Sequence, residues 1–226
     1  MIDFRFIRVL LFFLTLVFPL LAMPPNPVHK PIRTYKIALP QHAKPLIILD
    51  PGHGGSDEGA KVHYFMEKRL TLMTTLLLRK YLDEMGYRVI MTRSKDVYIP
   101  LHRRVSIANK TKAILFVSVH YNSSPSSEAH GIEVFYNGSG DQKRVQQSKK
   151  LAASVLGELT GHTQALSRGV KNGNFHVIRE TTMPAILVEG GFMTNPDERT
   201  QLRDKKYLEK IAKGMALGID KYLKPL

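Results

Sequence analysis

Residues 46–60 have the sequence LIILDPGHGGSDEGA, and this stretch decides the fold. Its first four residues are apolar, which predicts a short buried strand, and the Asp-Pro-Gly turn signal ends that strand at residue 50. The Gly-rich loop that follows carries a histidine, His53, just beyond the carboxyl end of the strand. Ligands of α/β sheets bind beyond the carboxyl ends of strands, so His53 is a candidate functional residue.

Strand and helix patterns alternate through the rest of the chain. We expect strands at 46–50, 87–92, 113–120, 131–136, 175–178 and 185–191, and helices at 67–85, 100–110, 142–159, 196–203 and 205–222. This alternation predicts an α/β fold. We expect a single three-layer domain with a twisted, mostly parallel or mixed sheet flanked by helices, of the phosphorylase/hydrolase-like type.

The first 44 residues differ in composition from the rest. Arg5 and Arg8 precede 14 apolar or near-apolar residues, which is typical of a signal peptide and short for a membrane span of about 20 residues. The cleavage signal is weak, so an uncleaved anchor is the alternative. The stretch MPPNPVHKP follows and cannot continue a helix. We therefore predict a signal peptide at 1–22, a Pro-rich linker at 23–44 and one domain at 45–226. The protein is expected to be exported to the periplasm or cell envelope.

Charge and cysteine content narrow the classes of function. The chain has no cysteine, so a metal ion would have to be bound by histidines and carboxylates. The formal net charge of +14 favours polyanionic surroundings, although a solubilising surface is the plain alternative. With an export signal, an anionic wall polymer or lipid fits better than nucleic acid. We expect no nucleic-acid binding, because the chain lacks Trp and PGHGG lacks the Gly-Lys-Ser/Thr ending of a phosphate-binding loop.

Four residues are expected at one rim of the sheet. His53 follows the first strand, and Glu67 begins the first helix. His120 and Glu189 lie at the ends of two apolar strands. Each has an ordinary structural interpretation when taken alone; a glutamate at a helix N-terminus, for example, is favoured by the helix dipole. Glu189 is the hardest to explain in that way, because a buried carboxylate needs a partner or a function.

Two histidines and one carboxylate form a common catalytic zinc set. We therefore predict that His53, Glu67 and His120 bind one zinc ion (Zn2+), which activates a water molecule and polarises a carbonyl group. Amide hydrolysis also needs a group that takes the proton of water and returns it to the leaving nitrogen, and we assign this role to Glu189. The remaining candidates, His63, His130 and His176, are expected to be structural or surface residues.

Seven motifs follow one another along residues 46–222: DPGHGG, EKRLTL, RVSIAN, FVSVHYNS, GIEVFY, SRGVK and MPAILVEGGFMTNPDE. In order and spacing they resemble the zinc-dependent N-acetylmuramoyl-L-alanine amidases of the amidase-3 type. The resemblance implies hydrolysis of the amide bond between N-acetylmuramic acid and L-alanine in bacterial peptidoglycan, for cell-wall remodelling or daughter-cell separation. It also implies His53, Glu67 and His120 as metal ligands and Glu189 as the catalytic glutamate.

The chain departs from this family at a few positions. Arg69 stands where the family usually has an acidic residue, Tyr121 where small residues are frequent, and Gly190 in place of a more common Val or Thr. These departures bear on substrate specificity and leave the ligands unchanged. Division-associated members carry a helical insertion that plugs the zinc site. Here about six residues separate Tyr136 from the next helical pattern, so we expect no autoinhibitory helix and an open site.

Two other functions are alternatives. A zinc peptidase acting on peptidoglycan stem peptides would use the same residues, so the identity of the products must decide. A non-catalytic peptidoglycan-binding protein is expected to have lost a ligand or Glu189, and all four residues are present. Peptidoglycan is the expected partner and a monomer the expected state, while an activator or a cell-division protein is left open.

Overall fold

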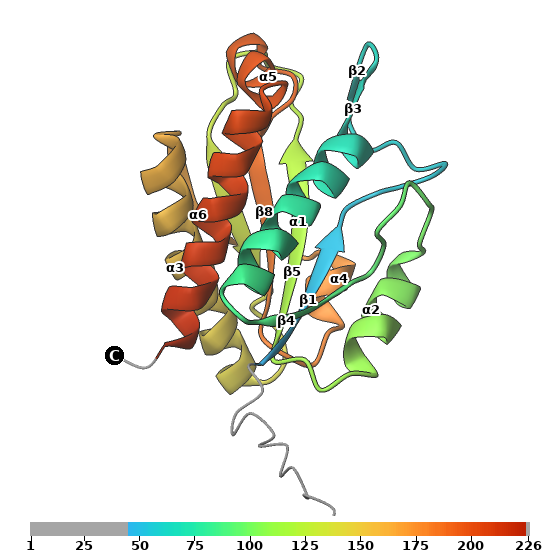
Figure 1. Cartoon of the computed structure of the whole chain (residues 1–226), viewed down its shortest axis with the longest axis vertical. Helices are drawn as coiled ribbons and strands as arrows, with labels where there is room; N and C mark the ends of the chain where they lie inside the picture. The colour runs from blue at the N-terminus through green and yellow to red at the C-terminus, as the bar shows by residue number, and fades with distance from the viewer. Residues whose placement is uncertain (1–44, 225–226) are drawn as a thin grey trace, which may run out of the picture. The chain divides into compact units, whose positions relative to one another are not determined.

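The computed structural model describes residues 45–224. The predicted signal peptide at 1–22 and the predicted linker at 23–44 lie outside the described residues. Strands and helices alternate along the described part of the chain, as expected (Figure 1). Among these residues, no helix combines the length and the apolar character that a membrane crossing requires.

Six strands form the main sheet, in the order β4-β1-β5-β8-β6-β7. They are β1 (Leu46–Pro51), β4 (Arg88–Met91), β5 (Leu115–Asn122), β6 (Ile132–Tyr136), β7 (Ser167–Asn172) and β8 (Ala185–Phe192). The neighbours from β4 to β8 are parallel, β6 is antiparallel to β8, and β7 is parallel to β6. The predicted mixed sheet is thus confirmed. Two short strands, β2 (Lys61–Val62) and β3 (Phe65–Met66), form a separate hairpin.

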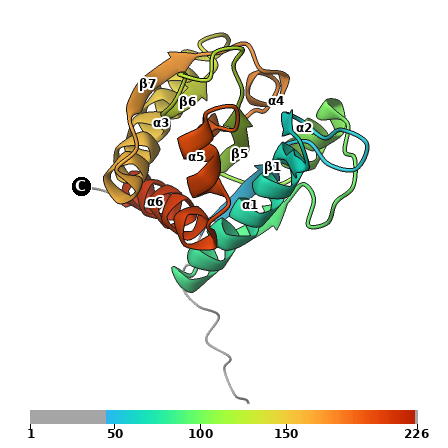
Figure 2. The same ribbon diagram turned by 90° about the horizontal axis from the view of Figure 1, so that it is seen from above.

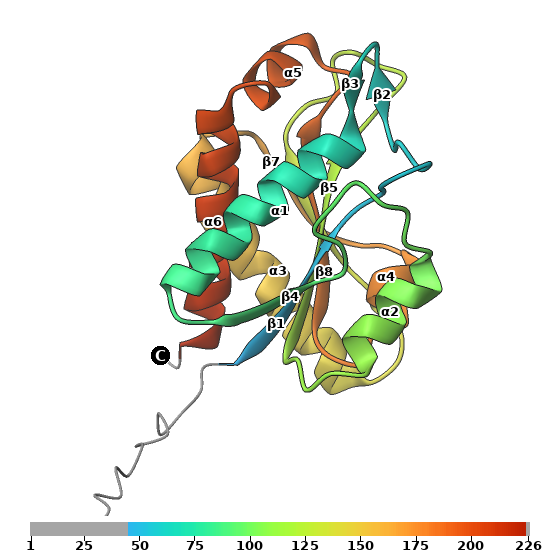
Figure 3. The same cartoon turned by 45° about the vertical axis from the view of Figure 1, so that its right-hand side comes forward.

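Helices cover both faces of the sheet, which confirms the three layers (Figure 3). One face carries α1 (Glu67–Glu84), α3 (Gln142–Thr163) and α6 (Lys205–Leu223), and the other carries α2 (Leu101–Asn109) and α4 (His176–Arg179). The short helix α5 (Pro196–Leu202) lies at the carboxyl end of β8. Gly214 and Gly218 let α6 approach α3 closely, because a Cβ at either position would lie under 3 Å from the α3 backbone.

The first strand shows how the core is divided. Ile47 and Leu49 pack into the larger apolar cluster with α1, α3 and α6, whereas Ile48 packs into the smaller cluster with α2 and α4. Successive side chains of a strand point to opposite faces of the sheet. A strand covered on both faces therefore has a continuous apolar sequence, which is the pattern of residues 46–49.

The predicted strand at 175–178 is wrong. Residues His176–Arg179 form helix α4, so His176 begins a helix, and the buried Val177 and Ile178 pack under the sheet. The outer neighbour of β6 is β7, a strand that the sequence pattern did not predict. Because β7 is an edge strand with one neighbour, it tolerates polar and exposed residues and lacks a clear apolar alternation.

Candidate metal centre

Three of the predicted site residues meet at the carboxyl end of the sheet. His53 lies in the loop after β1, Glu67 is the first residue of α1, and His120 lies on β5. In Figure 1 these elements converge at the upper end of the sheet. One potential ligand atom from each residue lies within 4.8 Å of the other two, and no other such group of three His, Cys, Asp or Glu residues occurs within residues 45–224. This cluster could therefore hold a metal ion.

Glu67 connects the two histidines. Its Oε2 lies 3.1 Å from Nε2 of His53, and its Oε1 lies 3.0 Å from Nδ1 of His120. The backbone N–H groups of Ala60 and Tyr121 each donate to one of the two carboxylate oxygens, at 2.8 and 3.1 Å. Burial alone would raise the pKa of Glu67, but hydrogen bonds and charge from His120 and His53 outweigh burial and hold that pKa far below its usual value. Glu67 is thus ionised and fixed in orientation, as a metal ligand must be.

Asp57 fixes the ring of His53. Nδ1 of His53 donates to Oδ1 of Asp57 at 2.9 Å, since a carboxylate only accepts, and this leaves Nε2 facing Glu67. A carboxylate behind a ligand histidine sets the tautomer and the orientation of the ring. Burial lowers the pKa of His53, but hydrogen bonds and charge from Glu67 and Asp57 outweigh burial and raise it above its ordinary value.

The glycines around His53 make room for the side chains of the cluster. A Cβ on Gly52 would lie 2.2 Å from Cε1 of His120, and a Cβ on Gly59 would lie 2.5 Å from Oε2 of Glu67. His53 itself has a φ of 59°, in the left-handed region that non-glycine residues rarely adopt. Such a conformation persists only where the surroundings fix it.

Two buried arginines fix the backbone of this loop. Arg104 on α2 donates to the carbonyl oxygens of Pro51 and His53, both at 2.6 Å. Arg93, which follows β4, donates to the carbonyl oxygens of Pro51 and Gly52, at 3.1 and 2.6 Å. The loop is therefore held by charged side chains from two other elements, which explains how His53 maintains its unusual φ.

Asp50, at the end of β1, balances this positive charge. Its Oδ1 accepts from Arg104 at 2.8 Å and from Thr92 at 2.6 Å, and its Oδ2 accepts from Ser118 at 2.9 Å. The sequence analysis missed Asp50, Arg93 and Arg104 as positioning residues. The available signal was an aspartate directly after the apolar residues 46–49 of a strand expected to be buried, because a charge in such a place needs a partner.

Glu189 lies next to the metal cluster on the neighbouring strand. It occupies the register position opposite His120 in the parallel pair of β5 and β8. The side chain is partly exposed, but its Oε2 is buried and has no hydrogen-bond partner among the described residues. Burial, followed by the negative charges of Glu67 and Glu133, raises the pKa of Glu189 well above the ordinary value. A buried, unpaired carboxyl with a perturbed pKa beside a metal cluster is typical of a catalytic acid or base.

A hollow of about 300 Å³ opens in front of the cluster. Its apolar wall consists of Tyr98, Ile99, Leu101 and Val177, and both cluster histidines line it. No helix lies between Tyr136 and Gln142 in the described structure, in agreement with the expected absence of a helical insertion. His63, His130 and His176 lie outside the metal cluster.

Comparison with known proteins identifies the family. The family model described as N-acetylmuramoyl-L-alanine amidase matches residues 47–221. The chain belongs to the N-acetylmuramoyl-L-alanine amidase family. The germination-specific N-acetylmuramoyl-L-alanine amidase of Bacillus subtilis (strain 168) is 34% identical over 200 residues, which are 82% of this chain and 82% of that relative.

Solved structures of amidases share the fold. An N-acetylmuramoyl-L-alanine amidase from Clostridium difficile 630 matches with a TM-score of 0.76 at 34% identity, covering 80% of this chain and 98% of the other. The CwlD amidase from Clostridioides difficile, solved in complex with the GerS lipoprotein, matches with a TM-score of 0.75 at 33% identity over the same shares of the two chains. The amidase activity predicted from the sequence motifs is thus confirmed at the level of the family.

Proposed function

We propose that this amidase hydrolyses the bond between N-acetylmuramic acid and L-alanine in peptidoglycan, with one zinc ion held by His53, Glu67 and His120. The observation that carries the proposal is the convergence of these three donors beside the unpaired carboxyl of Glu189. The same arrangement argues against the non-catalytic alternative, because a binding protein has no use for a buried carboxyl without a partner.

The donor set fits zinc. Two histidine nitrogens and one carboxylate are a common catalytic set for this ion, and Asp57 supports the tautomer that His53 needs. When bound, zinc would supply an acidified water molecule and polarise the scissile carbonyl group. In the protein itself, Glu67 contributes the negative charge, and the buried Arg104 maintains the loop that carries His53.

Glu189 is the proposed acid and base. Its ionised carboxylate accepts the proton of the attacking water, and its protonated form then donates to the leaving nitrogen of L-alanine. The raised pKa supports this assignment, because it increases the population of the protonated form from which donation occurs. The register position beside His120 supports it as well, since the proton must move between groups at one end of the sheet.

Mass spectrometry of digested peptidoglycan tests the proposal. Purified full-length protein would be incubated with purified peptidoglycan, alongside samples that contain a chelator or the Glu189→Gln variant. Free stem peptides that begin with L-alanine, absent from both controls, are the expected products. Shortened stems still joined to muramic acid would instead identify a stem-peptide peptidase, and no product under any metal condition would favour a binding protein.

Location and partners are extensions of this proposal. An exported enzyme in the periplasm or cell envelope, with a signal peptide at 1–22 and a linker at 23–44, agrees with a cell-wall substrate. We further propose that the protein is a monomer with an open site, active in wall remodelling or daughter-cell separation. The lipoprotein complex of the related CwlD amidase makes an accessory protein a reasonable candidate partner here.

A further inference from the structure

A row of functional side chains crosses the sheet at one level. His120 on β5 is in register with Glu189 on β8, and Glu189 is in register with Glu133 on β6. All three lie on the face covered by α2 and α4. Each is an even number of positions from an apolar residue of its own strand, Phe116, Leu187 or Phe135, that belongs to or packs against the apolar cluster on that face. The row therefore leads from the metal cluster past the proposed catalytic carboxyl to the edge of the sheet formed by β6 and β7. Figure 2 shows β6 and β7 at the side of the sheet away from β1.

Glu133 is held by three donors. Asn122 donates to its Oε1 at 2.6 Å, and Arg168 donates to its Oε2 at 3.0 Å. Lys171 donates to the same Oε2. Burial would raise the pKa of Glu133, but the hydrogen bonds and charges of Lys171 and Arg168 lower it, so the carboxylate is ionised. Because its oxygens are occupied, Glu133 holds the two cations in place and is unsuited to proton transfer.

Arg168 is positioned by more than this ion pair. Its guanidinium lies 4.8 Å from the centroid of the Phe192 ring, and its Nη1 donates to the carbonyl oxygen of His130 at 3.2 Å. The side chain also passes over Gly131, where a Cβ would lie 3.0 Å from Cγ of Arg168. Arg168 thus has a defined position on the rim although it comes from an edge strand.

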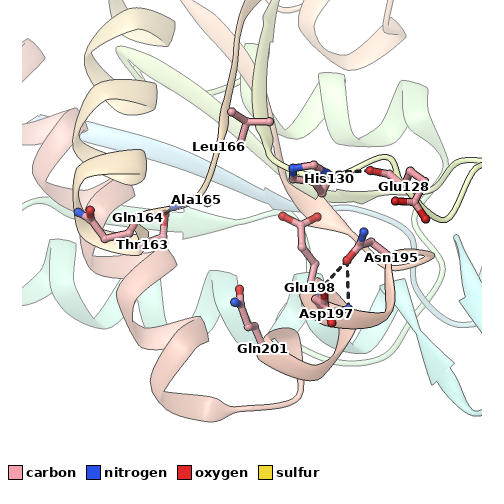
Figure 4. A pocket seen from close by; sticks show the side chains of 10 residues that line it. All are labelled: Glu128, His130, Thr163, Gln164, Ala165, Leu166, Asn195, Asp197, Glu198 and Gln201. Carbon is pink, nitrogen blue, oxygen red and sulfur yellow. Dashed lines mark hydrogen bonds between the residues drawn. The ribbon is translucent and has the colours of Figure 1, made fainter.

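Glu198 on α5 supports the surroundings of Arg168. Its carboxylate oxygens accept from the N–H groups of Gly131 and Phe192, at 2.9 and 2.6 Å. The buried Glu198 therefore anchors the backbone of two of the residues that contact Arg168. Figure 4 shows Glu198 in a polar hollow of about 330 Å³, together with His130, whose Nδ1 donates to the carbonyl oxygen of Glu128, and Asn195, whose side chain caps α5.

Glu133, Arg168 and Lys171 differ in how far their charged side chains are exposed to solvent. The side chain of Glu133 is 6% exposed, whereas those of Arg168 and Lys171 are 33% and 39% exposed. The two cations thus face solvent, whereas the carboxylate that pairs with both of them is buried. On the other side of the metal cluster, the exposed wall of the hollow is apolar and includes Tyr98 and Leu101. One side of the site is therefore suited to an anionic group and the other side to an apolar group.

We propose that Arg168 and Lys171 form a subsite that recognises a carboxylate in the peptide part of the substrate, so that the stem peptide lies over β6 and β7. This inference rests on the proposed function and deepens it. A planar guanidinium and an ammonium group that share one anchor are suited to binding a single carboxylate by charge-assisted hydrogen bonds. The subsite thus makes the enzyme sensitive to whether a stem-peptide carboxyl group is free or amidated, and it sets the direction in which the substrate crosses the metal centre.

A pair of substrates that differ in one group tests the inference. Muramoyl-L-alanyl-D-glutamate γ-methylamide carries a free α-carboxylate, and muramoyl-L-alanyl-D-isoglutamine γ-methylamide carries an amide in its place, so the second substrate has no carboxylate in its peptide part. We expect the wild-type KM to be about 5- to 20-fold lower for the free carboxylate, the range of one charge-assisted contact at a partly exposed site. Arg168→Gln and Lys171→Gln should each raise the KM for the carboxylate substrate, and the double variant should remove the discrimination. Arg168→Lys, which preserves the charge, should restore most of it.

Matched controls separate recognition from structure. Lys149→Gln removes one exposed charge from α3, on the opposite side of the sheet, and should leave the KM ratio unchanged. Thermal unfolding identifies variants that fail to fold, and Lys171→Gln then replaces Arg168→Gln as the decisive variant. Equal KM values for both substrates in the wild type, or discrimination that survives the double variant, would overturn the inference. Lack of hydrolysis of both substrates would instead contradict the proposed function itself.

Discussion

Asp50 and Arg104 form an ion pair in which both side chains are almost completely buried, with 1% and 3% exposure, directly behind the loop that carries His53. Removing one partner of a buried pair leaves an uncompensated charge, which costs about 3–5 kcal/mol. We therefore expect Arg104→Met to lower the free energy of unfolding by that amount, as measured by urea denaturation. The exposed pair of Lys80 and Glu84 provides the control, because Lys80→Met should change stability by less than about 1 kcal/mol. Similar losses in the two variants would contradict the positioning role of Arg104.

Replacing the proposed acid and base should separate catalysis from metal binding. Glu189→Gln preserves the shape of the side chain but cannot take the proton of water, so kcat is expected to fall by about 10²–10⁴. Metal content, measured by atomic emission, should equal that of the wild type. Glu209→Gln removes a carboxylate from α6 and should leave both quantities unchanged. A fall in kcat of less than tenfold for Glu189→Gln would exclude it as the acid and base.

Metal removal should inactivate the enzyme reversibly. Dialysis against a chelator is expected to abolish hydrolysis, and stoichiometric zinc should restore it, because the three donors are already close together. His120→Ala should bind less than one zinc ion per chain and remain inactive after the addition of zinc. His162→Gln, on α3, serves as the histidine control. Full activity of the chelated protein would rule out a metal-dependent mechanism.

A methyl group at Gly52 should displace a ligand. Its Cβ would meet three atoms of the His120 ring at 2.2–2.6 Å, so the ring must leave its present position in Gly52→Ala. We expect zinc affinity to fall at least 10-fold, the lower end of the effect of disturbing ligand support. Gly161→Ala is the matched control, since nothing lies within 4 Å of its added Cβ and alanine favours a helix interior by up to about 1 kcal/mol. Unchanged zinc affinity in Gly52→Ala would contradict the predicted ring position.

Tyr87 should contribute to alkaline unfolding. Burial, together with the hydrogen bond and charge of Asp220, raises its pKa from 10.0 to about 12. The folded state then binds the phenolic proton more tightly than the unfolded state, so this stabilisation is complete below pH 10 and is lost as the pH rises toward 12. Tyr87→Phe should reduce the slope of unfolding free energy against pH in that window. An identical slope in wild type and variant would refute this assignment.

The sequence predicted the central elements of the fold better than its edge. Residues 46–49 and 185–188 are covered on both faces, and their continuous apolar sequences indicated strands clearly. The stretch FHVI has a similar short apolar pattern but forms α4, because periodicity cannot distinguish a short strand from a single buried helical turn. The edge strand β7 was missed since its exposed residues include Ser167 and Arg168.

The sequence predicted the residues of the metal cluster and the proposed acid and base, but it missed the residues that hold them in position. Each of His53, Glu67, His120 and Glu189 has an ordinary structural interpretation when taken alone. They could be chosen because the expected strands and helix place all four at one rim of the sheet, and because they stand in the amidase-like motifs. The contacts of Arg93 and Arg104 with the loop backbone could not be predicted in this way. Hydrogen bonds to carbonyl oxygens leave no residue-type signature in a partner segment that lies 41 to 53 positions away. The cross-strand row from His120 to Glu133 likewise depends on register, which short apolar strands do not specify.

The position of β8 between β5 and β6 links hydrolysis to completion of the chain. The three residues of the metal cluster, His53, Glu67 and His120, all lie within the first 120 residues. The proposed acid and base, Glu189, instead lies on β8, which pairs with both β5 and β6. A nascent chain released before residue 189 would thus carry the ligands without the proton-transfer group. The proposed chemistry therefore requires β8 to pair on both sides, because only this last strand brings Glu189 into register with His120.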